Sequence, residues 1–310
     1  MTKVTLNVNL GGLAMKNPVT VASGAFGYGD EYEDYFDVSR LGAVTVKSLS
    51  LKPRPGNKPP RIVETPAGML NAIGLQNIGL ETYLKEKLPV LREKGCVIIA
   101  NIYGYSPEEY AELARRIENE NGADALEANL SCPNVHDARC ARGGALVAQF
   151  PERVKEYTQA VKAATSLPVF IKLSPNVTDI VASALAAQEG GADAVSLINT
   201  LLGMDIDIEK RRPKLGNIVG GLSGPAIRPV AVKMVWDAAR ALNIPVLGMG
   251  GICSAEDALQ FLLVGATAVA VGCASFRRPD AALKVVEGIE AYCLRHGIQD
   301  INALIGGLNA

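Results

Sequence analysis

The sequence has few of the residues that mark metal and disulfide proteins. It contains two histidines, His136 and His296, and its six cysteines form no Cys-x-x-Cys pair. Metal-dependent hydrolases need clustered histidines and acids, so the scarcity of histidine argues against that class. It also disfavours oxidases that use a histidine base. The cysteine pattern fits reduced thiols in a cytoplasm better than a disulfide framework.

Charge and hydropathy argue against nucleic acid and membrane as partners. The formal net charge is −1 at pH 7, so the chain has no bulk electrostatic attraction to nucleic acid or to an anionic membrane. Apolar runs such as residues 266–273 fall far short of the ~18 residues that span a bilayer. Residues 1–8 contain no charged segment followed by an apolar core, so we expect no signal peptide. These features predict a cytoplasmic protein.

Short apolar runs recur along the chain and alternate with helix-like stretches, which is typical of β/α units and a parallel sheet. The runs are apolar nearly throughout, as strands buried on both faces should be. There are eight of them, at residues 19–24, 43–49, 96–103, 125–131, 169–173, 194–199, 246–251 and 268–272. We therefore predict one (β/α)₈ TIM barrel domain over residues 1–310. An open doubly wound sheet is the weaker alternative, because no early Gly-x-Gly-x-x-Gly turn is present.

The stretches between the runs complete this prediction. Apolar spacing near 3.6 predicts helices over residues 107–119, 151–164, 177–188, 226–241, 254–263 and 279–295. Residues 5–15, with Gly11-Gly12 at the centre, predict an N-terminal β-hairpin that closes the bottom of the barrel. Two long polar stretches, residues 52–65 and 201–221, each follow a strand, so we expect long loops over the C-terminal face.

The residues that end barrel strands and begin the following loops carry the chemistry in this fold. A single Asn there is usually a turn residue, but asparagine recurs at several of these ends, and strand interiors disfavour it. Such amides suit a flat ligand edged with carbonyl and N–H groups, such as a pyrimidine. The polar set is Ser23, Gly24, Lys47, Ser48, Asn101, Asn129, Lys172, Asn199, Thr200, Gly250, Gly251, Gly272 and Cys273.

Lysines and glycines in this set indicate an anionic ligand. Lys47 and Lys172 lie in apolar strands. They either extend out of the barrel, pair with an acid, or meet a ligand carboxylate or reduced flavin. Gly250-Gly251 and Gly272 follow the last two strands, where barrels commonly bind phosphate, and Ser254 is placed to cap the next helix.

One cysteine differs from the others. Cys132 lies in a polar loop after the fourth strand, where a thiol can act as base or nucleophile. We interpret Cys96, Cys253, Cys273 and Cys293 as inert packing residues.

At this point the motifs resemble those of the dihydroorotate dehydrogenase family, in order and over essentially the whole chain. The matching stretches are residues 47–49, 53–57, 61–77, 129–134, 171–175, 198–200, 220–225, 248–251 and 271–272. Residues 64–77 and Cys132 resemble the NAD-linked class 1B catalytic subunit. The quinone-linked membrane class has serine in place of Cys132.

The resemblance implies an FMN across the barrel mouth. Its phosphate would lie at Gly250, Gly251 and Gly272, and Lys172 would face the N1 side of the flavin. The other implied cofactor contacts are Ala22, Ser23, Gly24, Lys47, Ser48, Asn101, Asn129, Ile198, Ser223, Gly224 and Cys273.

The resemblance also implies the substrate, the mechanism and the partner. Dihydroorotate would be oxidised to orotate in de novo pyrimidine biosynthesis. Cys132 would remove the C5 proton while hydride passes from C6 to FMN. The implied substrate contacts are Lys47, Asn71, Ile73, Gly74, Leu75, Asn129, Asn134, Asn199 and Thr200. Electrons would reach NAD through a second subunit that carries FAD and an iron–sulfur cluster, in a heterotetramer built on a catalytic homodimer.

Two departures and two alternatives accompany this interpretation. Residues 135–144 are longer than the family pattern and include Cys140, a competing thiol, and Cys273 stands where threonine is usual. One alternative is a flavoenzyme like dihydropyrimidine dehydrogenase, acting on an uncarboxylated ring. The other is a non-redox, phosphate-binding barrel lyase or isomerase that uses Lys47 or Lys172 as a Schiff-base amine.

Overall fold

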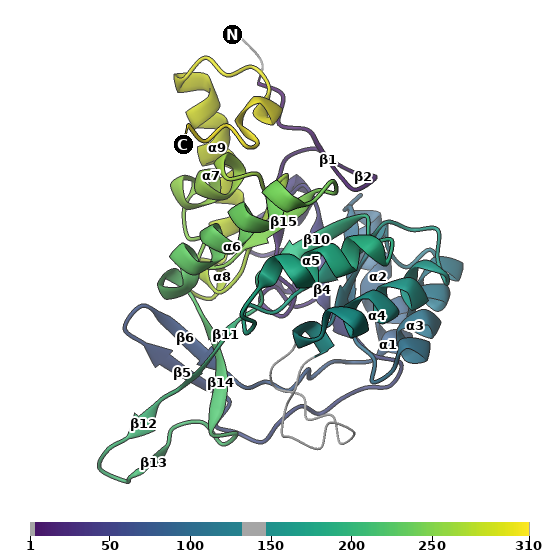
Figure 1. The fold of residues 1–310 in the computed structure, drawn as a ribbon, viewed down its shortest axis with the longest axis vertical. Coiled ribbons are helices and arrows are strands. Elements are labelled where there is room, and N and C mark those ends of the chain that lie inside the picture. Colours follow the sequence, from purple (N-terminus) through teal and green to yellow (C-terminus); the bar gives the residue numbers. More distant parts are fainter. Residues whose placement is uncertain (1–3, 132–146, 310) are drawn as a thin grey trace.

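The computed structural model describes residues 4–131 and 147–309. Its centre is a sheet of eight parallel strands whose spatial order follows the chain, the arrangement of a TIM barrel (Figure 1). The strands are β3 (Val19–Val21), β4 (Val44–Leu49), β7 (Ile98–Ile102), β8 (Ala125–Asn129), β9 (Val169–Lys172), β10 (Ala194–Leu197), β15 (Val246–Met249) and β16 (Ala268–Val271). All eight predicted strands are confirmed.

The barrel closes between β3 and β4, the two strands at the ends of the sheet. Strands β3 and β4 share no ladder hydrogen bonds, but the hydroxyls of Thr20 and Thr45 lie 3.0 Å apart between them. The backbone N–H of Gly42, two residues before β4, donates to the carbonyl of Val19 at 2.9 Å. The sheet is therefore a nearly closed barrel.

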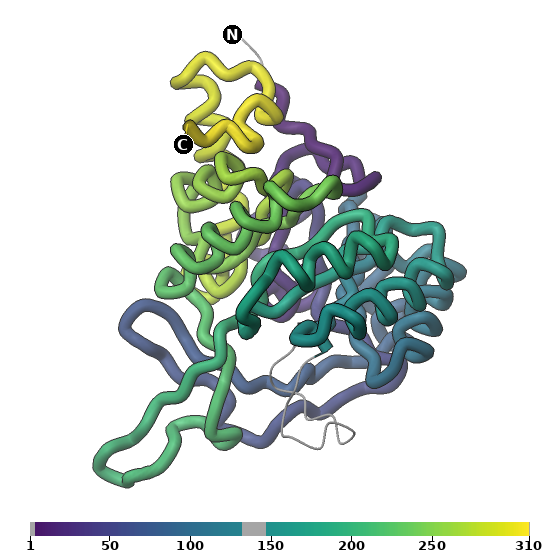
Figure 2. Tube along the Cα trace, viewed as in Figure 1, coloured from purple at the N-terminus to yellow at the C-terminus, as the bar shows by residue number. Residues whose placement is uncertain are grey.

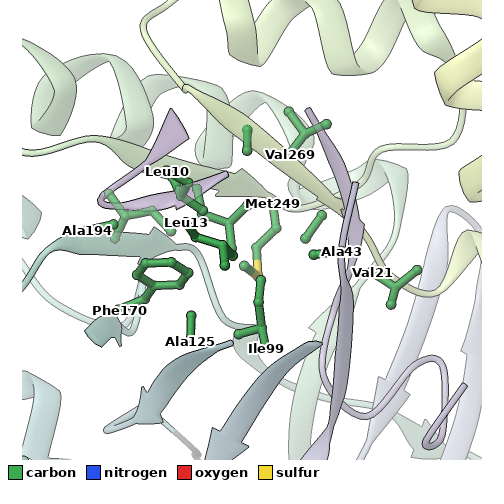
Figure 3. Close-up of a cluster of buried hydrophobic side chains, with 14 of the residues drawn as sticks. Leu10, Leu13, Val21, Ala43, Ile99, Ala125, Phe170, Ala194, Met249 and Val269 are labelled. Carbon is green, nitrogen blue, oxygen red and sulfur yellow. The ribbon is translucent and has the colours of Figure 1, made fainter. Parts of the chain in front are cut away.

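The barrel interior is filled by apolar side chains from alternate strand positions (Figure 3). Phe170 and Ile99 point into this interior and Val269 points away from it, yet all three are fully buried, which explains why these strands are apolar throughout. The N-terminal hairpin, β1 (Val8–Leu10) and β2 (Leu13–Met15), inserts Leu10 and Leu13 toward the same cluster, as Figure 3 shows. A Cβ on Gly11 would lie 2.3 Å from the carbonyl oxygen of Asp193, just before β10, so only glycine allows this approach. The predicted hairpin is confirmed, and it closes the N-terminal end.

Helices follow the strands and cover the barrel (Figure 1). The six predicted helices are present as α3 (Pro107–Asn119), α4 (Pro151–Lys162), α5 (Ile180–Glu189), α6 (Arg228–Ala241), α7 (Ala255–Leu263) and α9 (Ala281–Arg295). Helix α5 begins later than predicted because the Asp179 carboxylate accepts from the N–H groups of Val181 and Ala182 and caps it there. Helix α6 begins later because a 3₁₀ turn, η5 (Pro225–Ile227), precedes it.

The sequence did not predict several short helical segments. These are α1 (Leu80–Thr82), the π-helical η3 (Tyr83–Lys87), α2 (Leu88–Glu93) and α8 (Ala274–Arg277). The remaining 3₁₀ turns are η1 (Asp30–Tyr32), η2 (Val38–Arg40), η4 (Val147–Gln149) and η6 (Ile301–Leu304). Helix α8 is too short to define an apolar face, and the π-helical η3 interrupts the 3.6-residue period between α1 and α2.

The two stretches expected as long loops over the C-terminal face also contain short strands, which the sequence did not predict. Strands β11 (Leu201–Met204), β14 (Val219–Ser223), β6 (Gly68–Asn71) and β5 (Ile62–Thr65) form an antiparallel sheet in that order. A smaller pair, β12 (Ile206–Asp207) and β13 (Arg212–Pro213), continues it. Figure 2 shows this arm extending from the C-terminal end of the barrel. Its central pairing joins Gly221 to Asn71, which lie far apart in the chain, so no local pattern announces it.

Within the described ranges, no helix combines the length and the apolar character needed to cross a bilayer.

Candidate active site

A cavity of about 370 Å³ lies at the C-terminal ends of the barrel strands, between them and the antiparallel arm. Most residues that the sequence analysis placed in the site line it. From the strand ends come Ala22, Ser23, Gly24, Lys47, Ser48, Asn129, Lys172, Ile198, Asn199, Thr200, Gly250, Gly251, Gly272 and Cys273. From the arm and its connections come Asn71, Ile73, Gly74, Leu75, Ser223 and Gly224. Residues from opposite ends of the chain therefore meet in one space.

Asn101 is the exception among the described residues, because it lies below the cavity rather than in its wall. Its side chain is fully buried. The Ser48 hydroxyl donates to Asn101 Oδ1, and Asn101 Nδ2 donates to Glu127 Oε1 at 2.5 Å. Asn101 therefore holds Ser48 from beneath, and the cofactor contact expected of it stays a prediction.

Glu127 is a site residue that sequence reasoning missed. It lies on β8 with no exposed surface, and its Oε1 is 3.6 Å from the Nζ of Lys172, which lines the cavity. The sequence did carry a signal, because a carboxylate inside the apolar run Ala125–Asn129 is costly to bury without a partner.

A hydrogen-bonded row of amides and hydroxyls joins three strand ends. The Asn129 amide donates weakly to Ser48 Oγ at 3.4 Å, and Asn129 Oδ1 accepts from the Ser131 hydroxyl at 3.0 Å. Asn199 Nδ2 donates to Ser131 Oγ at 2.8 Å. The Asn199 carbonyl oxygen Oδ1 accepts from the N–H of Thr200 at 2.8 Å. These side chains are fixed before any ligand binds, so their remaining donors and acceptors are preorganised.

Lys47 gives the cavity a positive charge near one wall. Burial lowers the pKa of Lys47, the nearby Arg61 lowers it further, and Glu31 partly opposes both effects. Arg61 itself donates to Gln76 Oε1 at 2.7 Å, and Gln76 also lines the cavity. Two cations close together, only partly compensated by Glu31, favour an anionic ligand group at Lys47.

The loops after β15 and β16 form a backbone cradle. A Cβ on Gly251, where φ is +73°, would lie 2.7 Å from the carbonyl oxygen of Gly224 and 2.8 Å from Arg228 Cβ. Among the described residues, no backbone carbonyl accepts from the N–H of Gly251 or Cys273. These two donors can therefore face an anion, as backbone donors do in barrel phosphate sites.

The end of α7 next to the cradle is already satisfied. The Ser254 hydroxyl accepts from the N–H of Asp257, and the Asp257 side chain accepts from the N–H of Ser254, forming a capping box. Ser254 caps the helix as predicted. The N–H groups of Ser254 and Asp257 are therefore occupied, and the glycine loops next to them supply free donors to an anion in the cavity.

Cys273 lines the cavity beside the cradle, half-buried. Burial raises the pKa of its thiol, and a hydrogen bond with Ser223 opposes the shift. The thiol is therefore neutral near pH 7 and adds no negative charge to this part of the cavity.

Apolar side chains that sequence reasoning did not single out complete the walls. They are Ala25, Ile62, Met69, Ile227, Met249, Ile252, Ala270 and Phe276. Ile62 and Met69 lie on the arm, whose position depends on distant pairing. Apolar walls with a few placed polar groups are typical of sites for planar organic ligands.

Three residues of interest lie outside the described residues. They are Cys132, Asn134 and the competing thiol Cys140, so their predicted roles stay predictions. Within the described part of the chain, no three His, Cys, Asp or Glu side chains form a cluster that could hold a metal ion.

Comparisons with known proteins agree with this geometry. Residues 5–293 match the family model of dihydroorotate dehydrogenase. The chain is 54% identical over 306 residues to the "Dihydroorotate dehydrogenase B (NAD(+)), catalytic subunit" of Trichlorobacter lovleyi, covering 99% of both chains. It is 51% identical over 304 residues to the protein of the same name from Desulforamulus reducens, covering 98% of both.

A solved structure shares the fold. The crystal structure of DHODH from Eimeria tenella, in complex with ferulenol, superposes with a TM-score of 0.81 at 24% sequence identity. The match covers 98% of this chain and 88% of that one. The full-length sequence matches establish the relationship: this chain belongs to the dihydroorotate dehydrogenase family.

Proposed function

We propose that this protein oxidises dihydroorotate to orotate in pyrimidine biosynthesis, with FMN as its cofactor. Family membership supports this function. The observation that carries it in the structure is one cavity that combines a backbone phosphate cradle, two lysines and a row of fixed amides. The cradle would bind the flavin phosphate. The two lysines would meet the reduced flavin ring and the substrate carboxylate, and the amides would hydrogen-bond the pyrimidine ring.

The residues present fit an FMN. Gly250, Gly251, Gly272 and the N–H of Cys273 would hold its phosphate, and Ser48, Asn129 and Lys172 would face its ring system. Bound FMN would supply the acceptor of hydride from the substrate. The roles of the chain are then to bind the two ring systems, to orient them and to move a proton.

The substrate carboxylate would bind at Lys47. The neighbouring Arg61 strengthens the positive potential there, which favours a carboxylated ring over an uncharged dihydropyrimidine. Asn71 and Asn199 would hydrogen-bond the ring carbonyl and N–H groups, and both line the cavity. This charge is the reason to prefer dihydroorotate to dihydrouracil.

Cys132 would accept the C5 proton of the substrate. The residue before it, Ser131, is fully buried and held by Asn129 and Asn199, so the chain enters the Cys132 segment from a fixed point at the cavity. A thiol needs nearby positive charge to reach its thiolate form, and Lys47 and Lys172 are the cations that line this cavity.

A second subunit would complete the electron path. The relatives are named as catalytic subunits with NAD(+), which implies a partner for them. This sequence has no Cys-x-x-Cys pair of the kind that iron–sulfur ligands often form. We propose a partner with FAD and an iron–sulfur cluster, in a heterotetramer around a homodimer, with residues 1–310 acting as one FMN-binding domain.

The test is to purify the protein, record its absorption spectrum and add dihydroorotate without oxygen. Flavin bands that bleach with dihydroorotate, but far more slowly with dihydrouracil, would support the proposal. A colourless protein that gains no flavin bands with added FMN would favour a non-redox lyase or isomerase. Equal bleaching by both substrates would favour a dihydropyrimidine dehydrogenase-like activity.

A further inference from the structure

An acidic side chain lies inside the barrel directly below the cavity. Ala125, Glu127 and Asn129 alternate along β8, so all three point to the same side of the strand. Asn129 lines the cavity, and Ala125 lies in the core cluster of Figure 3. Glu127 therefore projects into the barrel between the apolar core and the cavity floor, and its side chain has no exposed surface.

The Glu127 carboxylate is only partly satisfied. Its Oε1 accepts from Asn101 Nδ2 at 2.5 Å and lies 3.6 Å from Lys172 Nζ, which is within ion-pair reach but beyond a normal hydrogen bond. Its Oε2 has no hydrogen-bond partner among the described residues. The Lys172 side chain is also almost fully buried, with 5% exposed.

Stability alone does not explain this pair. Burying two charges costs several kcal/mol per ion, and replacing such a pair by apolar residues is often neutral or stabilising. The strands on either side fill the barrel with Ile99, Phe170 and other apolar side chains, so an apolar residue would be compatible here. Both contacts of Glu127 connect it to residues of the cavity wall. One is Lys172 itself, and the other is Asn101, which accepts from the hydroxyl of Ser48.

We propose that Glu127 is a positioning residue, which holds the Lys172 ammonium in place below the flavin and offsets part of its charge. The inference rests on the proposed FMN site. A carboxylate within ion-pair distance reduces the positive potential that a buried ammonium presents to its other neighbours. Reduction makes a flavin more negative, so Glu127 lowers the stability of reduced FMN relative to oxidised FMN and keeps its midpoint potential low.

The test is Glu127→Gln in the FMN-loaded protein, with the midpoint potential measured by an anaerobic spectroelectrochemical titration. Glutamine keeps an oxygen that can accept from Asn101 and removes the charge. We expect the equilibrium to shift about tenfold toward reduced FMN, or roughly 30 mV for a two-electron couple. An unchanged or lower potential would overturn the proposal.

A double-mutant cycle separates action through Lys172 from a general loss of charge. In a Lys172→Met background, the effect of Glu127→Gln on the potential should largely disappear. A shift of the same size in both backgrounds would show that Glu127 acts on the flavin by itself, and would overturn the positioning role. The matched control is Asp193→Asn, which removes an acid paired with Lys162 at 2.7 Å near the start of β10. It should leave the potential unchanged.

A second variant covers failure of Glu127→Gln to fold. Glu127→Asp keeps the charge but withdraws it by one methylene, so we expect a smaller shift in the same direction, and no shift would count against the proposal. The titration uses a chemical reductant rather than dihydroorotate. A potential that shifts in a protein that does not oxidise dihydroorotate would refute the substrate proposal and leave this inference standing. A protein that binds no FMN would refute both.

Discussion

The side-chain amide of Asn199 donates to the hydroxyl of Ser131 at 2.8 Å and to its carbonyl oxygen at 3.3 Å. The bonds join the loop after β10 to the loop after β8. Because Ser131 directly precedes Cys132, this contact fixes the point from which the proposed catalytic segment departs. Hydrogen bonds of this kind orient a reacting group at no cost during the reaction.

The first prediction concerns the proposed base. Cys132→Ala should slow the reduction of FMN by dihydroorotate about 10²- to 10⁴-fold, the usual contribution of a placed base. Orotate binding should change only severalfold, because the amides and Lys47 remain. Anaerobic stopped-flow absorbance and an orotate titration measure the two effects. Cys140→Ala is the matched control; if it slows reduction more than Cys132→Ala, the base assignment is wrong.

The second prediction concerns the charge of Lys47. Lys47→Met should weaken orotate binding about 10- to 100-fold, which corresponds to the roughly 1.5–3 kcal/mol of a hydrogen bond to a charged group. Lys58→Met, at an exposed lysine between β4 and β5, should have little effect. An equal loss in both variants would show that the effect is one of general charge.

The same lysine predicts a pH dependence. Burial and Arg61 lower the pKa of Lys47, so its charge is present below that lowered pKa and is lost as the pH rises through it. Orotate affinity should therefore fall with rising pH at values below the usual titration range of lysine. Flavin spectral titrations with orotate across the alkaline range measure this. In Lys47→Met this phase should vanish, and its persistence there would assign it to another group.

The third prediction concerns the phosphate cradle. In Gly251→Ala the new Cβ would collide with the Gly224 carbonyl and with Arg228, so FMN affinity should fall at least about tenfold as the loop shifts. Gly297→Ala is the control, because its φ is +67° and no atom lies within 4 Å of its Cβ position. Both variants share the backbone strain, and only Gly251→Ala should lose FMN. Fluorescence titration of deflavinated protein measures the affinity, and equal FMN loss in both would refute the cradle.

The fourth prediction concerns Cys273. A neutral thiol is a weak hydrogen-bond donor. Cys273→Thr should therefore tighten FMN binding by a fewfold, because a hydroxyl donates more strongly to phosphate. Cys253→Thr, at an exposed cysteine nearby, should leave the affinity unchanged. Weaker binding in Cys273→Thr would mean that the thiol packs against the cofactor instead of donating to it.

Local patterns were sufficient to predict the barrel itself. Each barrel strand is a short apolar run, and helices such as α3 carry their own start signal, with Ser106 accepting from the N–H of Glu109. These signals lie within a few residues of one another, so they survive in the sequence without any knowledge of the fold. The strand-end rule then placed most cavity residues, because strands that alternate with helices end on the same face.

Contacts between distant segments were not predictable in this way. Arg61 lies next to β5, and it approaches Lys47 because β5 is held in the arm through β6 and β14. Asn101 was expected in the cavity wall, yet it lies beneath Ser48 because its amide bonds to Glu127 on the next strand. Which of two neighbouring polar residues reaches a ligand depends on side-chain packing, which the sequence does not encode locally.

The sequence by itself determined the order of strands and helices, the barrel and the polar character of its open end. Hydrophobic periodicity and capping act over a few residues and need no partner. Only the tertiary structure decided that Glu127 stands behind Lys172, that the arm forms a wall of the cavity, and that Asn199 holds Ser131. Those relationships join residues dozens of positions apart, and their energies exist only once the barrel has closed around them.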